Sequence, residues 1–291
     1  MPLFPSSIFD QVYFHLPEFN HLFPLHVCQQ KTQRGAITIE NCIFGFLLSM
    51  SHLEILSLEG LRNDGRRWNE MRNFFCRVGI EPSENGSSYV QHGNTRVMCI
   101  INGPSEPAVK SKSRADRAFV NVDINIAPFS TIDRKRRFKS DRRIQLQCLA
   151  LQRTFEQVLQ IELYPKSQIS INLHVLHDDG AVVATCMNAA TLALMDAGIP
   201  MTDYVCCSTA GIVDSDILLD LNSLEESDLS WMTVAVMGTK NKVTYLQLET
   251  KMHLDYLDSV MNIAIAGAEQ IYHMMQSAIR QSAKPYLAKL V

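Results

Sequence analysis

Two neighbouring stretches of this chain carry the residues whose types and spacing suit chemistry. Residues 133–143, with the sequence DRKRRFKSDRR, form its most charged segment, and such a cluster of cations suits phosphate groups. Residues 175–226 gather polar groups at their turns, among them His177, Asp178 and Asp179. A histidine beside two carboxylates could hold a metal ion or transfer a proton, so any catalysis is expected in this second stretch.

The basic segment has a simple interpretation and a functional one. It could be a solvated loop that precedes a helix, which is the usual role of an isolated basic run. However, Ser140 or Asp141 can cap that helix, which places Arg142 and Arg143 in its first turn. Cations there oppose the helix dipole unless an anion joins them, and Phe138 adds a ring on which a base can stack. We therefore expect the segment to bind single-stranded RNA or DNA.

The acidic turn also has two interpretations. Asp179-Gly180 is typical of a tight turn, because glycine tolerates positive φ. The strand at residues 168–177 would then turn into a second strand at residues 181–186, and an alanine-rich helix would follow at residues 187–197. We prefer this solvated hairpin turn to a paired-carboxylate or metal site formed with the neighbouring histidine.

The elements around these stretches predict two groups of strands and two long helices. The first group is expected to form an antiparallel meander, and it comprises residues 74–80, 87–91, 96–101 and 119–127. The second group comprises residues 204–210, 217–221, 232–237 and 243–249. The helix after the basic segment has an apolar face of Ile144, Leu149, Phe155, Val158 and Leu159. A C-terminal helix is expected at residues 253–281, with Pro285 limiting its extension.

The composition is that of an ordinary globular chain. It is 46% hydrophobic and 20% charged, which excludes a disordered or membrane protein, and a net charge of −3 means that a basic site must be local. The 8 cysteines form no C-x-x-C pair, so reduced thiols are favoured over zinc or disulfides. Residues 1–49 are rich in aromatic residues and proline and poor in charge. We expect them to be a poorly ordered N-terminal extension or a gene-model artefact, and residues 50–291 to be the folded domain.

Five ordered motifs carry a resemblance to a known family. They read RNDGRR, QHGNTRV, FSTIDRKRRFKSDRR, HDDGAVVATCMNAATLALMDAGIPM and LLDLNSLEE, over residues 58–284. The chain resembles the RNase PH family, and within it the ring subunits of the RNA exosome. The resemblance implies an α+β (two-layer α/β) RNase PH-type domain, with mixed sheets packed against helices and a long C-terminal helix. It implies no metal and no cofactor.

The resemblance also implies a lost activity. Active members of the family degrade RNA from its 3′ end with inorganic phosphate, which a Ser/Thr-Arg element holds after the glycine of the turn. Here Gly180 is followed by Ala181, Val182 and Val183, so this phosphate site is degenerate. Active members carry two aspartates six residues apart in a later loop.

In the corresponding loop this chain keeps Asp220 but has Glu226 as the second acid. The longer glutamate side chain displaces the carboxylate, although glutamate can transfer protons in principle. We expect both positions to be vestigial and the chain to have no catalytic residues of its own.

The arginines are retained where the phosphate site is lost. By resemblance, Arg142 and Arg143 match the pair that binds the RNA backbone, and Lys135, Arg136 and Arg137 lie just upstream. Five other arginines could contact RNA, form structural ion pairs or contact neighbouring subunits, and the sequence leaves these alternatives open: Arg62, Arg66, Arg67, Arg114 and Arg117.

The most specific hypothesis is a non-catalytic exosome ring subunit that serves as scaffold and RNA-channel lining in rRNA maturation and mRNA turnover. The implied partners are single-stranded RNA, other RNase PH-like ring subunits, S1/KH cap subunits and a separate hydrolytic nuclease, with no membrane. The implied location is the nucleus, including the nucleolus, and the cytoplasm. The alternatives are an active phosphate-dependent 3′-to-5′ exoribonuclease and a free-standing single-stranded nucleic-acid-binding protein.

Overall fold

The computed structural model describes most of the chain after residue 54. The described residues are 55–57, 59–107, 114–132, 134, 141–213, 216–240 and 242–287, with side chains described as far as residue 283. The proposed extension, residues 1–49, lies outside this part, and so do Lys135, Arg136 and Arg137 of the basic segment.

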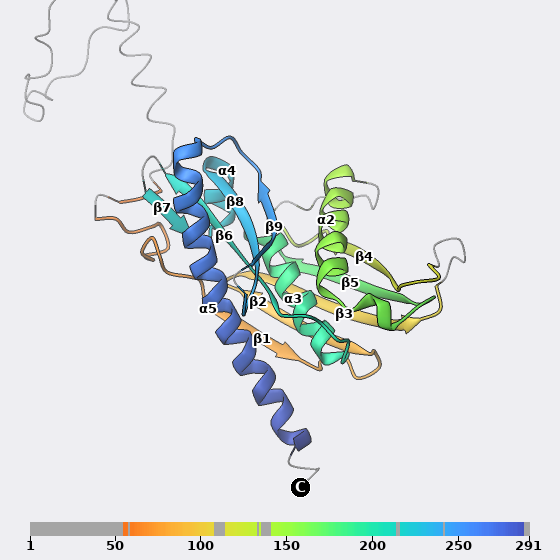
Figure 1. The fold of residues 1–291 in the computed structure, drawn as a ribbon. Coiled ribbons are helices and arrows are strands. Elements are labelled where there is room, and N and C mark those ends of the chain that lie inside the picture. The colour runs from red at the N-terminus through yellow and green to blue at the C-terminus, as the bar shows by residue number, and fades with distance from the viewer. Residues whose placement is uncertain are drawn as a thin grey trace, which may run out of the picture. The chain divides into compact units, whose positions relative to one another are not determined.

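The first half of the chain forms a five-stranded sheet in the order β1-β2-β3-β5-β4 (Figure 1). The strands are β1 (Phe74–Val78), β2 (Gly86–His92), β3 (Thr95–Ser105), β4 (Phe119–Ile126) and β5 (Gln168–His177). The predicted meander is wrong at its last strand, because β5 lies between β3 and β4 and pairs in parallel with β4. Parallel neighbours need a crossover, which a helix between β4 and β5 supplies.

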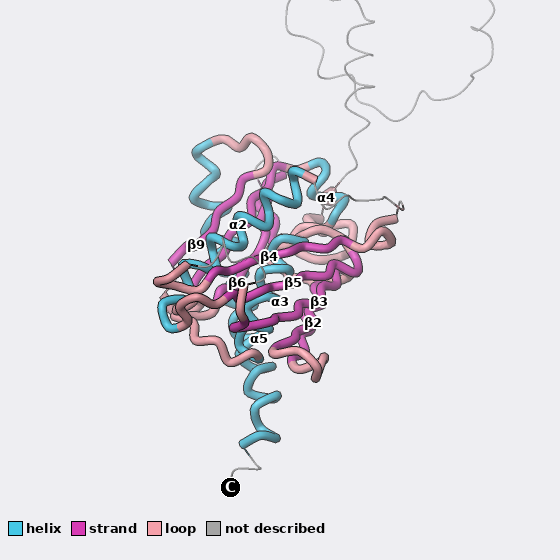
Figure 2. The backbone as a smooth tube through the Cα atoms, turned by 90° about the vertical axis from the view of Figure 1, so that its right-hand side faces the viewer, coloured by secondary structure: helices cyan, strands magenta, loops and turns pink. Residues whose placement is uncertain are grey.

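That crossover helix is α2 (Arg142–Val158). Asp141, one of the two predicted capping residues, caps this helix. Its Oδ1 accepts a hydrogen bond from the Arg143 N–H at 3.2 Å. The predicted apolar face is wrong at Leu149, which is exposed, and it omits Leu151, which is buried. Figure 2 shows α2 running alongside the sheet.

The second half forms a four-stranded antiparallel sheet in the order β7-β6-β8-β9. Its strands are β6 (Val205–Val213), β7 (Asp216–Leu219), β8 (Ser230–Met237) and β9 (Lys242–Leu248), each within two residues of its predicted start. A short helix, α4 (Ser223–Asp228), separates β7 from β8.

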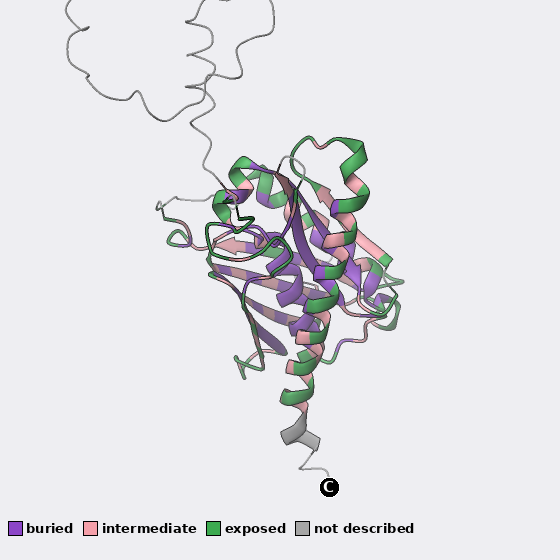
Figure 3. Ribbon diagram, turned by 90° about the vertical axis from the view of Figure 1, so that its left-hand side faces the viewer, coloured by how far each residue is buried: buried purple, intermediate pink, exposed green. Residues whose placement is uncertain are grey.

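Helix α3 (Val182–Asp196) lies between the two sheets and is buried along most of its length (Figure 3). The strand predicted at residues 181–186 is therefore wrong, because the helix begins five residues earlier than expected. Ala181 adopts φ +54°, which turns the chain directly into the helix instead of into a hairpin. Small residues let sheet and helix approach closely: a Cβ on Gly86 would lie 2.5 Å from the Ala193 carbonyl oxygen.

The C-terminal helix α5 (Leu254–Leu287) packs on β6 and β8. Its buried positions follow helical spacing and are Val260, Ala264, Ala268, Ile271 and Met275. The helix continues past Pro285, so the predicted limit is wrong. Although α5 is long, none of the helices within the described residues is apolar enough over sufficient length to cross a bilayer.

Candidate functional site

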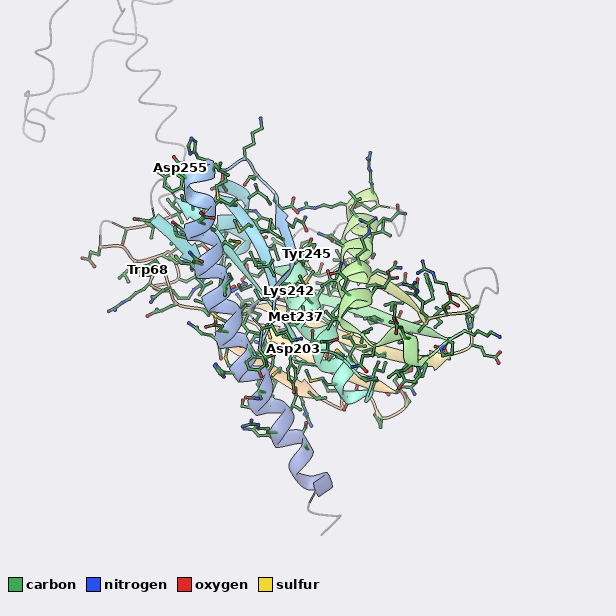
Figure 4. The ribbon with its side chains drawn as sticks, viewed as in Figure 1. Trp68, Asp203, Met237, Lys242, Tyr245 and Asp255 are labelled. Carbon is green, nitrogen blue, oxygen red and sulfur yellow. The ribbon has the colours of Figure 1, made fainter. Side chains whose placement is uncertain are left out.

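Three segments that are far apart in the sequence meet at one end of α3. They are the turn between β5 and α3, the loop and short helix α4 that follow β7, and residues 62–72 before β1. The Leu219 N–H donates to the Trp68 carbonyl at 2.8 Å, and the position of Trp68 marks this junction in Figure 4. The RNDGRR motif, the HDDGA turn and the LLDLNSLEE motif therefore come together in space.

Asp220 is the centre of the junction and is 1% exposed. Its carboxylate accepts hydrogen bonds from the Arg72 N–H at 2.8 Å, from Nε at 3.0 Å and from Nη2 at 2.8 Å. His92 Nε2 lies 3.1 Å from Asp220 Oδ2. Burial alone would raise the pKa of Asp220, but the charges of His92 and Arg72 hold it well below its usual range. Asp220 is thus ionised at neutral pH and is paired with Arg72 in a buried site.

A second buried ion pair secures the same loop. Arg62 Nε donates to Glu225 Oε1 at 2.8 Å, and both side chains are buried. The Arg62 guanidinium also donates to the Leu219 carbonyl at 2.6 Å and to the Asp220 carbonyl at 2.8 Å. Glu225 in turn forms a capping box with Asn222 at the start of α4. Arg62 therefore has a structural role.

The other arginines near the junction differ in exposure. Arg66 is mostly buried and donates to the Asp220 carbonyl and to Asn222 Oδ1, both at 3.1 Å. It is thus structural, like Arg62. Three others are exposed, which leaves RNA or subunit contacts open for them: Arg67, Arg114 and Arg117.

The acidic turn is part of this junction and is no hairpin. The Asp179 carbonyl accepts from Arg72 Nη1 at 2.7 Å, and its Oδ2 accepts from Asn94 Nδ2 at 3.0 Å. The Gly180 carbonyl accepts from Thr95 Oγ1 at 2.7 Å. The prediction of a solvated hairpin turn is therefore wrong. In the described part of the chain, no His, Cys, Asp and Glu side chains cluster in a way that suits a metal ion.

The residues after Gly180 offer only backbone groups and apolar side chains to an anion. Ala181 and Val183 are buried, Val182 is half-buried, and α3 begins at Val182. The Ala181 N–H donates to Glu226 Oε1 at 2.6 Å. Sequence reasoning identified both positions and did not foresee that they bind each other.

The surroundings of Glu226 shift its ionisation. Burial raises the pKa of Glu226 from the ordinary value of 4.5 to about 7, assisted by the negative charges of Asp178 and Asp220. The Ala181 N–H and the charge of Arg72 oppose this shift without cancelling it. Glu226 therefore titrates near neutral pH, unlike Asp220 in the same loop.

A pH dependence of stability follows from this shift. Because the folded protein holds the Glu226 proton up to a higher pH than the unfolded chain, stability falls as pH rises from 4.5 to 7. We expect Glu226→Gln to gain stability relative to wild type between pH 5 and pH 8, by on the order of 2 kcal/mol. Urea unfolding at several pH values measures this gain. Asp228→Asn, on the exposed end of α4, is the control, and a constant difference between the Glu226→Gln and wild-type curves would contradict the expectation.

Arg142 and Arg143 begin α2 and are both exposed. Neither guanidinium takes part in the described bonds of the Asp220 junction. Their position is therefore open to an external ligand.

The structure adds three residues that sequence reasoning did not assign to the site: Arg72, His92 and Glu225. His92 lies within the QHGNTRV motif, and Glu225 within LLDLNSLEE, so both motifs held a signal. Nothing in the sequence links Arg72 to Asp220, which lies 148 residues away.

The fold and the junction define the class of protein. Residues 70–200 match the 3′ exoribonuclease family, domain 1, and residues 203–267 match domain 2 of that family. Together these matches span more than half of the chain, and the chain belongs to this family, the RNase PH family. The resemblance carried by the five motifs is confirmed.

Particular relatives extend the match over almost their whole lengths. Exosome complex component ski6 of Schizosaccharomyces pombe is 76% identical over 241 residues, which are 83% of this chain and 100% of the relative. Exosome complex component SKI6 of Saccharomyces cerevisiae is 42% identical over 237 residues, 81% of this chain and 96% of the relative. Exosome complex component RRP41 of Homo sapiens is 38% identical over 234 residues, with 80% and 96% covered.

Solved structures support the α+β fold. Rrp46 from rice superposes with a TM-score of 0.68 at 21% identity, over 75% of this chain and 100% of that one. A chain of the Archaeoglobus fulgidus exosome with RNA bound to the active site gives a TM-score of 0.65 at 20% identity, over 74% of this chain and 93% of that one. The predicted α+β RNase PH-type fold with sheets packed against helices and a long C-terminal helix is confirmed, although only the five-stranded sheet is mixed and the four-stranded sheet is antiparallel.

Proposed function

We propose that this chain is a non-catalytic ring subunit of an RNA exosome core, acting as scaffold and channel lining in 3′-to-5′ RNA processing and degradation. Its relatives named as exosome complex components cover four fifths of the chain at up to 76% identity. The absence of catalysis is inferred from the turn that follows Gly180. Where phosphate would need a hydroxyl and a guanidinium, the chain has Ala181, Val182 and Val183, and Glu226 binds the Ala181 N–H.

The two acidic positions support the same conclusion. Asp220 is enclosed by Arg72 and His92 and is 1% exposed, so its carboxylate cannot reach a substrate. A general acid or base must lie within hydrogen-bond reach of the proton that it transfers. Asp220 is therefore a vestige of the family's catalytic loop that now holds the fold together.

RNA contact is assigned to the exposed arginines at the start of α2. Arg142 and Arg143 are exposed, and Lys135, Arg136 and Arg137 belong to the same basic segment. These residues would bind phosphates of single-stranded RNA without reading its sequence. The chain would thread RNA through the ring without cutting it.

The assembly follows from this role. The partners are other RNase PH-like ring subunits, S1/KH cap subunits and a separate hydrolytic nuclease that performs the cleavage. rRNA maturation and mRNA turnover would place the complex in the nucleus, including the nucleolus, and in the cytoplasm. The six described cysteines are free thiols.

A phosphorolysis assay tests the absence of catalysis. We expect a ring reconstituted from this chain and its ring partners, without the hydrolytic nuclease, to release no ADP from poly(A) in millimolar phosphate. A phosphorolytic member of the same family serves as the positive control. Phosphate-dependent ADP release by the ring would contradict the proposal and would favour the active exoribonuclease.

A further inference from the structure

The N-terminus of α3 is an anion-binding position by construction. A helix of 15 residues leaves its first N–H groups unpaired and carries a partial positive charge at that end. Such ends bind phosphate, sulfate and carboxylate groups in many proteins. Here the anion comes from the chain itself, because Glu226 Oε1 accepts from the Ala181 N–H at 2.6 Å across a separation of 45 residues.

The loop that carries Glu226 is fixed against this helix end by independent contacts. A Cβ on Gly180 would lie 2.7 Å from the Asn222 carbonyl carbon, so the loop backbone rests directly on the turn. Trp231 Nε1 donates to the Glu226 carbonyl at 3.1 Å, and Asn222 caps α4. The backbone that carries Glu226 is therefore fixed against the turn, and the carboxylate reaches the Ala181 N–H from this position.

We propose that Glu226 is a built-in anion whose carboxylate occupies the N-terminus of α3 and keeps inorganic phosphate out of that position. Two anions cannot share one helix end without strong mutual repulsion. The space is also filled by the side chain, which must leave before another acceptor can reach the Ala181 N–H. The site is thus closed by an added group as well as by the missing hydroxyl and guanidinium.

Phosphate binding can be measured on the full chain without RNA and without ring partners. This role of Glu226 can therefore fail or hold independently of the proposed function. The measurement belongs at pH 8, above the pKa of about 7, where Glu226 carries its charge in the wild type.

Truncation of Glu226 is the decisive experiment. We expect Glu226→Ala to bind phosphate about tenfold more tightly than wild type, with a dissociation constant in the millimolar range, because the helix end becomes free. Titration with phosphate at constant ionic strength, followed by the Ala181 amide resonance, reports both affinity and location. Asp228→Ala removes the same charge from α4 without opening the helix end, and it should bind phosphate like wild type.

A second small variant, Glu226→Ser, covers the case in which Glu226→Ala does not fold. The proposal holds if either folded variant gains phosphate binding at Ala181 and Asp228→Ala does not. It is overturned if the folded Glu226 variants bind phosphate no better than wild type, or if Asp228→Ala gains as much as they do.

Discussion

Reversing the charges of Arg142 and Arg143 is expected to weaken the binding of single-stranded RNA by the assembled ring by about 10 to 100-fold at low salt. Each arginine is exposed at the start of α2, where it can pair with one backbone phosphate. Each neutralised phosphate of a single strand contributes about −0.7 to the slope of log K against log salt, so the slope of the double variant should be less negative by about 1.4. Fluorescence anisotropy of a labelled RNA at several salt concentrations measures both quantities.

Arg153→Glu provides a matched control for this experiment. Arg153 is exposed on the same helix, about three turns from Arg142, and its reversal changes the net charge in the same direction. We expect it to leave the salt slope unchanged and the affinity within about twofold of wild type, because screening limits its distant effect. If the double variant and wild type have equal affinity and equal salt slope, Arg142 and Arg143 do not bind the RNA.

Replacing Asp220 with asparagine is expected to destabilise the fold by about 3–5 kcal/mol, because it leaves Arg72 as an uncompensated charge in a buried site. Arg72 makes its hydrogen bonds to the Asp220 carboxylate through its backbone N–H, Nε and Nη2. The asparagine side chain keeps the shape but provides one acceptor oxygen and no charge. Chemical denaturation of wild type and variant measures the difference.

The acid limb of the stability profile gives a second readout for Asp220. Its folded pKa lies well below the unfolded value, so its contribution is complete above about pH 4 and is lost as pH falls toward the folded pKa. Asp220→Asn should therefore flatten the acid limb. Asp216→Asn, an exposed change on β7, should alter neither the acid limb nor the stability by more than about 0.5 kcal/mol. A wild-type denaturation curve for Asp220→Asn would show that the carboxylate is dispensable to the fold.

The strands and long helices were predictable where one periodicity governs a segment. β5 was predicted residue for residue, because its inward positions Ile169, Ile171, Leu173 and Val175 alternate with half-buried ones. The order of the strands was less accessible. No local sequence pattern in β4 predicts that it pairs with β5, because that pairing depends on the path of the chain through the crossover helix α2.

The start of α3 was misread for a specific physical reason. The residues after Gly180 include Val182, Val183 and Thr185, whose branched side chains favour strands in isolation. Tertiary packing overrides this preference, since α3 is enclosed by both sheets. The turn that redirects the chain depends on the positive φ of Ala181, which alanine rarely adopts.

The site was predictable as a set of positions but not as a set of contacts. Asp220, Glu226 and the turn at Gly180 were each identified by resemblance. The pairing of Asp220 with Arg72 and of Glu226 with Ala181 joins residues 148 and 45 positions apart, and no local pattern encodes it.

The contact between Arg62 and Glu225 spans 163 residues, which has a consequence for how the chain acquires its structure. Closing so long a loop lowers the conformational entropy of the chain before the pair can form. We therefore expect the junction to form late in folding. During synthesis, Arg62 and Arg72 emerge well before Glu225 and Asp220, the acids that pair with them. A chain that ends before these acids therefore displays two buried-site cations without their partners.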